Sequence, residues 1–437
     1  MAETVSGFPF WELRFDKDAK PVDDAALQTF LREVKEQGLT DLFVFSHGWN
    51  NDPAVARRLY RGFFGEVRKL LDDAGVTKSR QAKVGTAGVI WPSILFPDED
   101  TGADSSGGAA SLGGGGASGD FFTELRKVFV EPDQQPILDD LERLLNERKR
   151  SEGALREFKR KLDQLLAGEA VDAGSEDNLE QRGIVESEDP RELFEALAEN
   201  ETSEDSEGGA AGLGDAFGRL WDGAKGALRV TTYYQMKSRA GKVGREGLGP
   251  LLGRLHQGAP DVRIHLLGHS FGARLVSYSL SGLPAGGTSP VKSLFLLQGA
   301  FSHFTFADAL PFDRRRKGDL AGMASRVDGP LLTTHSLKDL AVGKAYPTAS
   351  IVARQDASAA GDVVSRWGAM GNDGAQAVDA QSRPLSRPGT AYPLQDGKWL
   401  NLDGNQVIVN GGPPSGSHSD IIHPETAWAA LAAAKIV

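Results

Sequence analysis

The sequence predicts an α/β protein with a mostly parallel, doubly wound sheet. Two observations carry this prediction: short apolar runs alternate with amphipathic stretches of helical length, and the longest of these runs are apolar throughout. Continuous apolar runs are typical of strands buried on both faces, as in parallel sheets covered by helices. A third observation, one long polar interruption, predicts an insertion into this core.

The first elements follow the alternation. We expect a short strand over 9–15, an amphipathic helix over 23–37 and a buried strand in the run LTDLFVF. A helix over 53–73 and a further strand in KVGTAGVIWPS come next. These elements would form the first half of the sheet.

The pattern then breaks, and residues 97–235 are the expected insertion, which leaves 1–96 and 236–437 as the core. The insertion begins with a Gly/Ser-rich stretch, continues with two helical patterns and ends in an acidic segment, so flexible ends and a helical middle are expected. Ligands of open α/β sheets bind at the carboxyl ends of the strands. Because the insertion leaves from a strand end, we expect a mostly helical cap there.

The alternation resumes with a helix over 244–257, a strand over 262–267, a helix from Gly272 and a strand in VKSLFLLQGA. GPLLTTHS is a further strand candidate. The last third is expected to be loop-rich until a final helix that begins at Pro424.

Composition narrows the function classes. The 437-residue chain carries a net charge of −11, which argues against nucleic-acid binding and against electrostatic attachment to membranes. It contains no cysteine, so disulfides, thiolate catalysis and cysteine zinc sites are excluded. We see neither a secretory-signal pattern nor an apolar stretch of membrane-spanning length, so we expect a cytoplasmic protein without stable membrane association.

The segment IHLLGHSFGARLV contains the most informative motif. Ser270 lies between a predicted strand and a predicted helix, with Gly268 and Gly272 two residues away on either side. A turn this tight strains its central residue, and flanking glycines avoid collisions with the neighbouring strand and helix. The turn also directs free helix N–H groups toward the serine hydroxyl, which suits a nucleophile whose attack produces an oxyanion.

A second motif, FVFSHGWNN, ends another buried strand. With these two motifs the chain resembles the α/β-hydrolase family over roughly 40–92 and 244–437, whereas the insertion matches no lid that we can identify. The resemblance implies that Ser270 is a catalytic nucleophile and that the backbone N–H groups of Trp49 and Phe271 form an oxyanion hole.

The resemblance has further implications for residues around the nucleophile. Gly48 would let the backbone approach the substrate closely, and His269 is expected beside the substrate. His47 would order the strand end rather than take part in the chemistry.

The family's chain order is serine, then acid, then histidine. Four histidines follow the serine. His303 comes too early and His335 precedes any convincing acid. His418 lies in a loop of small residues before the final helix and is the predicted base. His423 directly precedes that helix, where a capping or packing role is expected, and it is the alternative base.

Asp339, just beyond the predicted strand GPLLTTHS, is the predicted acid, because an imidazole base needs a carboxylate to fix its tautomer. The alternatives are Asp308, Asp313, Asp356 and Asp362.

Neither a metal nor an organic cofactor is expected. His418, Asp420 and His423 have ligand-like spacing, but no further region supplies convergent ligands. Gly114, Gly116 and Gly119 match a dinucleotide-binding pattern, but no strand precedes them at the right distance.

The sequence therefore predicts a serine hydrolase that cleaves small carboxylic esters through an acyl-enzyme. A thioesterase, lipase or amidase of the same fold, a non-catalytic binding protein on that fold, and a lipid-surface enzyme with the insertion as its lid remain open. One set of aromatic residues either lines an acyl pocket or packs in the core: Trp49, Trp91, Phe96, Phe301, Phe304 and Phe306.

Overall fold

The computed structural model describes residues 3–49, 51–93, 118–167, 189–201, 213–344, 368–412 and 415–437. Several expectations lie outside these residues: the Gly/Ser-rich stretch up to 117, most of the acidic stretch 171–210, and the candidates Phe96, Gly114, Gly116, Asp356 and Asp362.

The described strands form one nine-stranded sheet in the order β1-β2-β4-β3-β5-β6-β7-β9-β8. β1 is antiparallel to β2, and all other neighbouring strands are parallel. The predicted α/β class with a mostly parallel sheet is therefore confirmed. The strands are β1 (Glu3–Val5), β2 (Phe8–Arg14), β3 (Asp41–Ser46), β4 (Val84–Ile90), β5 (Arg263–His269), β6 (Val291–Leu297), β7 (Leu331–His335), β8 (Ala380–Pro384) and β9 (Trp399–Asp403).

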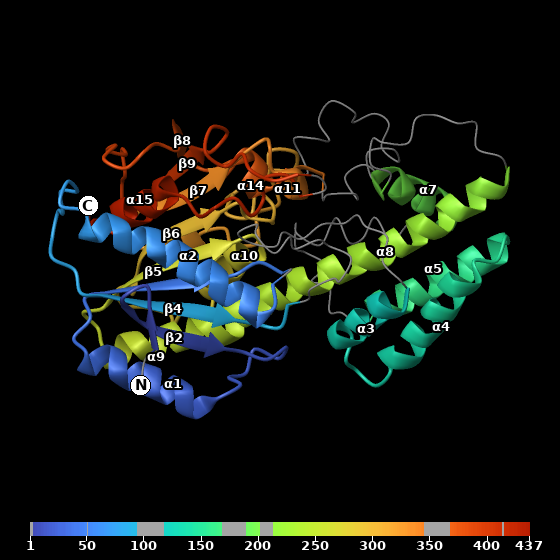
Figure 1. The fold of residues 1–437 in the computed structure, drawn as a ribbon, viewed down its shortest axis with the longest axis horizontal. Coiled ribbons are helices and arrows are strands. Elements are labelled where there is room, and N and C mark those ends of the chain that lie inside the picture. Colours follow the sequence, from blue (N-terminus) through green and yellow to red (C-terminus); the bar gives the residue numbers. More distant parts are fainter. Residues whose placement is uncertain are drawn as a thin grey trace.

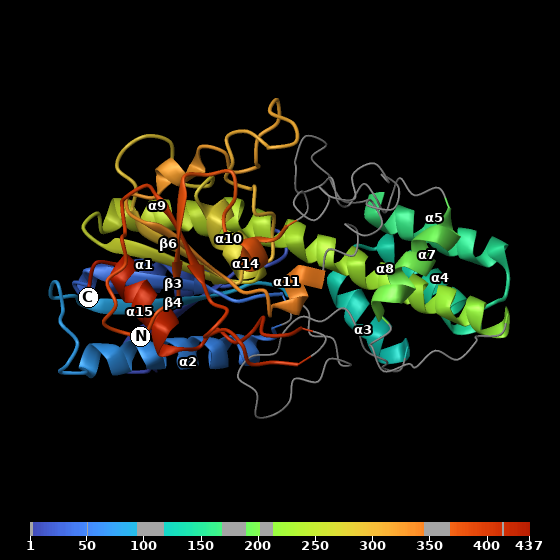
Figure 2. The same ribbon diagram turned by 90° about the horizontal axis from the view of Figure 1, so that it is seen from above.

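Helices pack on both faces of the sheet, with α9 and α10 on one side and α2 and α15 on the other (Figure 2). Each face buries its own apolar layer, which explains why the central strands are apolar along their whole length. The helices of the two layers are α1 (Asp24–Glu36), α9 (Gly249–Gly258) and α10 (Phe271–Ser279), and α2 (Pro53–Asp72) and α15 (Pro424–Ala433).

The predicted helix starts are formed by local capping. The carboxylate of Asp23 accepts a hydrogen bond from the backbone N–H of Ala26 at the start of α1. Asp52 accepts one from Val55 in the same way, and Pro53 occupies the first turn of α2. Both aspartates satisfy an N–H group that the helix itself leaves unpaired.

The connections of β3 and β5 run in opposite directions. The chain leaves β3, passes through α2 and returns to β4, whereas it leaves β5, passes through α10 and returns to β6 on the other side. Since β3 and β5 are neighbours, the strand order reverses between them. In open α/β sheets the crevice outside the carboxyl ends of such a pair is where ligands bind.

The helices between β4 and α9 extend beyond the edge of the sheet toward which the parallel strands point (Figure 1). These helices are α3 (Ser118–Val128), α4 (Gln134–Glu147), α5 (Glu152–Ala167), α7 (Pro190–Glu201) and α8 (Leu213–Lys242). α5, α7 and α8 share an aromatic core in which Phe158 contacts Phe194 and Trp221 edge-on. At Gly223 of α8 an added Cβ would collide with the backbone of Phe194, so α7 and α8 pack closely.

α8 joins these helices to the sheet-bearing core. It continues without a break through the π-helical segment η2 (Val243–Leu248) into α9, so the domain boundary expected at residue 235 lies within α8. Arg239 of α8 donates to the backbone carbonyl groups of Pro92 and Val128, at 3.2 and 3.0 Å. It thereby connects the end of β4 to the end of α3.

Two expectations about individual elements were wrong, and some short elements were not expected. Residues 380–384 and 399–403 are paired as β8 and β9, although this third of the chain was expected to be loop-rich. The second of the two helical patterns in the insertion, ILDDLERLLNERKRSEGALREFKRKLDQLLAG, is broken into α4 and α5 at Arg148, whose φ of 42° is left-handed. The short elements α11 (Leu340–Lys344), α14 (Met370–Asp373) and the 3₁₀ turn Met323–Arg326 were not expected.

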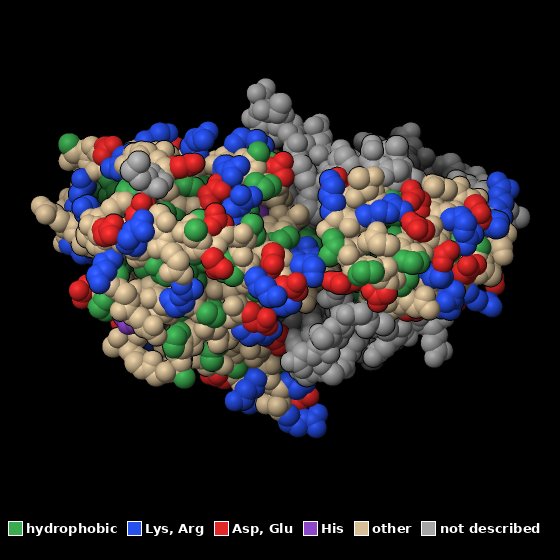
Figure 3. All heavy atoms as spheres, turned by 90° about the horizontal axis from the view of Figure 1, so that it is seen from below, with side chains coloured by type: hydrophobic (Ala, Val, Ile, Leu, Met, Phe, Trp, Pro, Cys, Tyr) green, Lys and Arg blue, Asp and Glu red, His purple; other side chains and the backbone are tan. Residues whose placement is uncertain are grey.

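Charged side chains of both signs are interspersed over the face drawn in Figure 3. Several link neighbouring helices, as Arg126 of α3 does with Asp139 and Glu142 of α4. Among the described residues, none of the helices combines the length and apolar character needed to cross a membrane.

Candidate active site

Ser270 lies at the turn between β5 and α10, as the sequence predicts, and its backbone is strained. Its φ and ψ are 57° and −124°, a conformation that non-glycine residues seldom adopt. Two backbone hydrogen bonds to the neighbouring strand and the loop after it hold it there: the Ser270 N–H donates to Leu297 at the end of β6, and the Ser270 carbonyl accepts from Ala300. The strain is therefore supported by the neighbouring strand.

Both flanking glycines are required sterically. A Cβ on Gly268 would collide with the backbone of Gly272 and Ala273, and a Cβ on Gly272 would collide with the backbone oxygen of Ser46 at the end of β3. The Gly-x-Ser-x-Gly spacing thus reflects a helix that begins in direct contact with the adjacent strand.

The loop after β3 also contacts the serine. A Cβ on Gly48 would lie 2.9 Å from Ser270 Cβ and 3.3 Å from its Oγ, so only glycine allows this approach. The Trp49 ring packs beside those of Phe271 and Tyr233. Phe271 is the first residue of α10, where a helix leaves the backbone N–H without an intrahelical acceptor.

His418 and Asp339 meet as the sequence predicts. The imidazole Nδ1 and the carboxylate Oδ2 are 2.7 Å apart, and the side chains are 2% and 0% exposed. Their loops are joined by backbone hydrogen bonds, from Ser417 N–H to Lys338 O and from Ala341 N–H to Ser415 O. This pairing fixes the acid loop against the loop that carries the imidazole.

His269, at the end of β5, contacts the loop that carries His418. Its Nε2 lies 2.9 Å from the backbone carbonyl of His418, and the two imidazole rings are 4.9 Å apart. Burial, together with the nearby His418, lowers the pKa of His269 to about 3, so its ring is neutral and Nε2–H is the donor. The structure thus gives His269 a loop-holding contact, whereas the sequence suggested contact with substrate.

The bond between serine and imidazole is not formed in this structure. Within the described residues Ser270 Oγ has no hydrogen-bond partner, and the side chain is only 1% exposed. Unformed or long catalytic hydrogen bonds are common in structures without substrate. Ser270 and the His418–Asp339 pair are connected through His269, the neighbour of Ser270 in the chain.

The alternative bases and acids have other partners. His423 Nε2 is 2.9 Å from Asp420 Oδ1, and its backbone N–H donates to Thr426 Oγ1 at the start of α15. His303 pairs with Asp373 at 3.0 Å. Of the remaining candidates within the described residues, Asp308 is exposed and Asp313 pairs with Arg315.

The aromatic candidates do not gather in one place. Trp49 lies beside Phe271, whereas Trp91 stacks on His47 at 5.6 Å. Phe306 packs against Trp399. Phe304 contacts His303, and Phe301 is fully buried in the core. These side chains are buried and contribute to packing at several points of the fold.

His47 is buried against Trp91, and its Nδ1 lies 2.7 Å from the carbonyl of Gly48. Burial lowers the pKa of His47 to about 4, so the ring is neutral and holds the Gly48 carbonyl through its Nδ1–H. This contact agrees with the structural role expected for His47.

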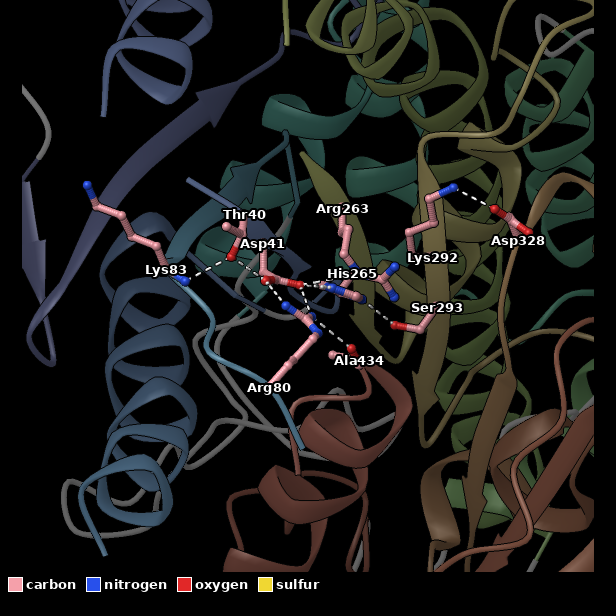
Figure 4. A network of polar contacts seen from close by, with 10 residues as sticks. All are labelled: Thr40, Asp41, Arg80, Lys83, Arg263, His265, Lys292, Ser293, Asp328 and Ala434. Carbon is pink, nitrogen blue, oxygen red and sulfur yellow. Dashed lines mark hydrogen bonds and ion pairs between the residues drawn. The ribbon is translucent and has the colours of Figure 1, made fainter. Parts of the chain in front are cut away.

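A second serine–histidine–aspartate arrangement lies at the opposite, amino edge of the strands (Figure 4). His265 Nε2 is 2.9 Å from Asp41 Oδ1, and its Nδ1 is 2.8 Å from Ser293 Oγ. Although burial raises the pKa of Asp41, hydrogen bonds from His265, Arg80 and Thr40 lower it well below its usual range. Burial lowers the pKa of His265.

This second arrangement lacks the other features of a nucleophile site. Ser293 lies within β6 with no positive φ, and its hydroxyl is already hydrogen-bonded. No helix begins at Ser293 to supply free N–H groups. Both Ser293 and Ser270 belong to sets of serine, histidine and aspartate. Ser270 differs from Ser293 in its strained backbone and in the free N–H groups of the helix that begins beside it.

Sequence reasoning did not identify two residues that contact the candidate site, Tyr233 and Gln298, nor Thr334, which holds one of them. Tyr233 of α8 packs on Phe271 with ring centroids 4.8 Å apart. Gln298, which follows β6, donates to Asp339, and Thr334 of β7 contacts Gln298. Only the position of Gln298, directly after an apolar strand, was visible in the sequence.

Comparison of the chain with protein-family models, with curated proteins and with solved structures finds no match.

Proposed function

We propose that this protein is a serine hydrolase of the α/β-hydrolase type that cleaves carboxylic esters. The observation that carries the proposal is the strained Ser270 backbone at a strand–turn–helix junction, at the point where the strand order reverses. The bonded His418–Asp339 pair on neighbouring loops supports it, since the three residues follow the chain order of that fold.

In the proposed reaction His418 Nε2 removes the proton from Ser270 Oγ as the oxygen attacks the ester carbonyl. The proton then passes to the departing alcohol, and an acyl-enzyme on Ser270 remains. Water, deprotonated by the same nitrogen, releases the acid and restores the serine. Asp339 accepts the Nδ1–H bond throughout, which fixes the tautomer and stabilises the imidazolium.

The negative charge on the substrate oxygen would be held by the backbone N–H groups of Phe271 and Trp49. Phe271 begins α10 and Trp49 follows the Gly48 approach to Ser270, which supports both assignments. Each such donor contributes about 3–4 kcal/mol to transition-state stabilisation in comparable sites.

The helices α3 to α8 would act as a cap over this edge of the sheet. Tyr233 of α8 packs against Phe271 and Trp49, the two residues proposed for the oxyanion hole. Because Ser270 is 1% exposed, a substrate reaches it only after the residues around it shift. The burial of Ser270 also favours the second candidate, a non-catalytic binding protein on the same fold.

Fluorophosphonate labelling distinguishes the two candidates. The wild-type protein should be labelled at Ser270 and should hydrolyse short p-nitrophenyl esters. Ser270→Ala should lose the label and about 10³-fold or more in kcat. Ser277→Ala is the matched control and should keep both, because Ser277 is a buried serine of the same helix whose hydroxyl donates to Ala273 O. A wild-type protein that takes up no label would favour the binding protein.

A further inference from the structure

We propose that Gln298 is a positioning residue that fixes the carboxylate of Asp339 for His418. This inference deepens the proposed function and rests on it. Gln298 follows β6 directly, is fully buried and has a φ of 46°, a left-handed value that side-chain-bearing residues seldom adopt. Such strain persists only where the surroundings over-determine the conformation.

The surroundings of Gln298 hold both its backbone and its side chain. The Gln298 N–H donates to Thr334 Oγ1 at 3.0 Å, and the same hydroxyl donates to Gln298 Oε1 at 2.9 Å. Thr334 lies on β7, the strand next to β6. One threonine hydroxyl therefore closes a ring with the glutamine and anchors the oxygen end of its amide.

The nitrogen end of the amide is directed at the acid. Gln298 Nε2 donates to the carbonyl of Gly371 at 3.0 Å and to Asp339 Oδ2 at 2.8 Å. A carbonyl can only accept, so the NH₂ group must face Gly371, and its second N–H is then available to Asp339. The same orientation places Oε1 on the Thr334 hydroxyl, so all four contacts agree.

Asp339 Oδ2 thus receives two hydrogen bonds, one from Gln298 Nε2 and one from His418 Nδ1. The other oxygen, Oδ1, accepts the backbone N–H of Val342 at 3.2 Å. Three donors fix the plane of a carboxylate that is fully buried. The amide supplies its donor without a charge, so it does not compete with His418 as an ionic partner.

The same stretch of chain also supports the nucleophile. Leu297, the residue before Gln298, accepts the backbone N–H of Ser270. The end of β6 therefore contacts both the serine turn and the acid. A change in the Gln298 side chain removes only the second of these contacts, which makes the residue suitable for a test.

The test compares Gln298→Met, which keeps the volume and removes the donor, with Ser293→Ala. Ser293 lies on the same strand at its other end and loses a buried hydrogen bond to His265, so it is a control for general destabilisation. For each variant we would measure the His418 tautomer by ¹⁵N NMR, kcat and KM for a p-nitrophenyl ester, and the free energy of unfolding.

For Gln298→Met we expect a mixture of His418 tautomers in place of the single Nδ1–H form. We also expect kcat to fall about tenfold or more, the order seen when a charged group loses a hydrogen bond. KM should stay within about twofold, because the substrate contacts are unchanged. Ser293→Ala should keep the wild-type tautomer and kcat.

An unchanged tautomer and kcat in Gln298→Met would overturn the proposal, and so would an equal change in Ser293→Ala. If Gln298→Met does not fold, Thr334→Val takes its place, because it frees Oε1 without touching Asp339, and the same two readouts decide. A tautomer change in a protein that hydrolyses no ester and takes up no fluorophosphonate would instead sink the hydrolase function and leave the positioning role standing.

Discussion

Ser270 and Gln298 have positive φ values at the carboxyl ends of neighbouring strands, and their strain has different origins. At Ser270 the turn is forced by the close contact of α10 with β3, which the flanking glycines permit. At Gln298 the conformation is held by hydrogen bonds from its own amide and from Thr334. Backbone strain of this kind persists where packing or bonding fixes it, and it concentrates at functional sites.

The steric origin of the serine turn can be tested at Gly272. Gly272→Ala places a methyl group against the Ser46 backbone oxygen, and overpacking of this kind costs about 1–3 kcal/mol. We expect that loss in the free energy of urea unfolding, together with loss of labelling at Ser270. Gly258→Ala, where an added Cβ has open space, is the control and should change neither. A fully stable, fully labelled Gly272→Ala would contradict the close contact.

Substitution of His418 should affect catalysis, whereas substitution of His423 should affect stability. His418→Ala should reduce kcat by about 10³-fold or more, as expected when a triad member is lost. His423→Ala should instead remove the bond of the His423 side chain to Asp420, at a cost of about 1 kcal/mol in stability with kcat retained. Ester hydrolysis and urea unfolding of both variants would check this, and the reverse ranking would make His423 the base.

At the scale of elements, the sequence predicted those strands whose apolar runs are continuous, because burial on both faces leaves a signal in composition. β8 was missed because it lies at the sheet edge and four of its five residues are exposed, so no apolar run marks it. The break at Arg148 was also missed, since neither glycine nor proline occurs there.

Some residues of the candidate site could likewise be predicted from the sequence, and others could not. Ser270, Asp339 and His418 were predicted because local motifs and chain order mark them, and the structure brings the last two into contact. The contacts of Gln298, Tyr233 and His269 depend on residues far away in the chain, such as Thr334 and Phe271, so no local pattern reveals them.

The buried cluster at the amino edge ties β3 to the C-terminal helix. Arg80 donates to the Asp41 carboxylate and to the carbonyl of Ala434, at the end of α15. Arg80→Met leaves the fully buried Asp41 with fewer donors, and such losses cost about 3–5 kcal/mol.

Arg156→Met is the matched control for Arg80→Met, because Arg156 pairs with Glu152 on an exposed helix surface where both side chains are more than half exposed. Exposed pairs contribute about 0–1 kcal/mol. Urea unfolding of both variants measures the difference. Equal, small losses would mean that water replaces Arg80 around Asp41.

At the scale of the whole molecule, the fold buries several neutral histidines. Burial lowers the pKa values of His47 and His269 to about 4 and 3, and it lowers those of His265 and His335 as well. In the unfolded chain these groups bind protons near pH 6.5, whereas in the folded chain they do not. The stability that these histidines contribute is therefore fully present above pH 6.5, and it is lost as the pH falls below that value.

His423 has the opposite sign. Its hydrogen bond with Asp420 raises its pKa despite partial burial. The stability that it contributes is present below pH 6.5 and is lost as the pH rises through the raised value. The buried neutral histidines thus make the stability depend on pH below 6.5, whereas His423 makes it depend on pH above 6.5. Mutation can therefore separate the two contributions.

The free energy of unfolding should accordingly fall below pH 6.5 with a slope of about 1 kcal/mol per pH unit for each histidine that is kept neutral. His269→Gln retains an N–H donor for the His418 carbonyl and removes one titrating group, so between pH 6 and pH 4 its slope should be shallower by about that amount. His423→Gln should lower the stability by a constant amount below pH 6.5, leave the slope between pH 6 and pH 4 unaltered, and change the slope only above pH 6.5. Urea unfolding of the three proteins over pH 4–8 provides the measurement. A slope in His269→Gln equal to that of the wild type would mean that His269 is protonated in the folded protein, and the donor assigned to its contact with His418 would then need a charged ring.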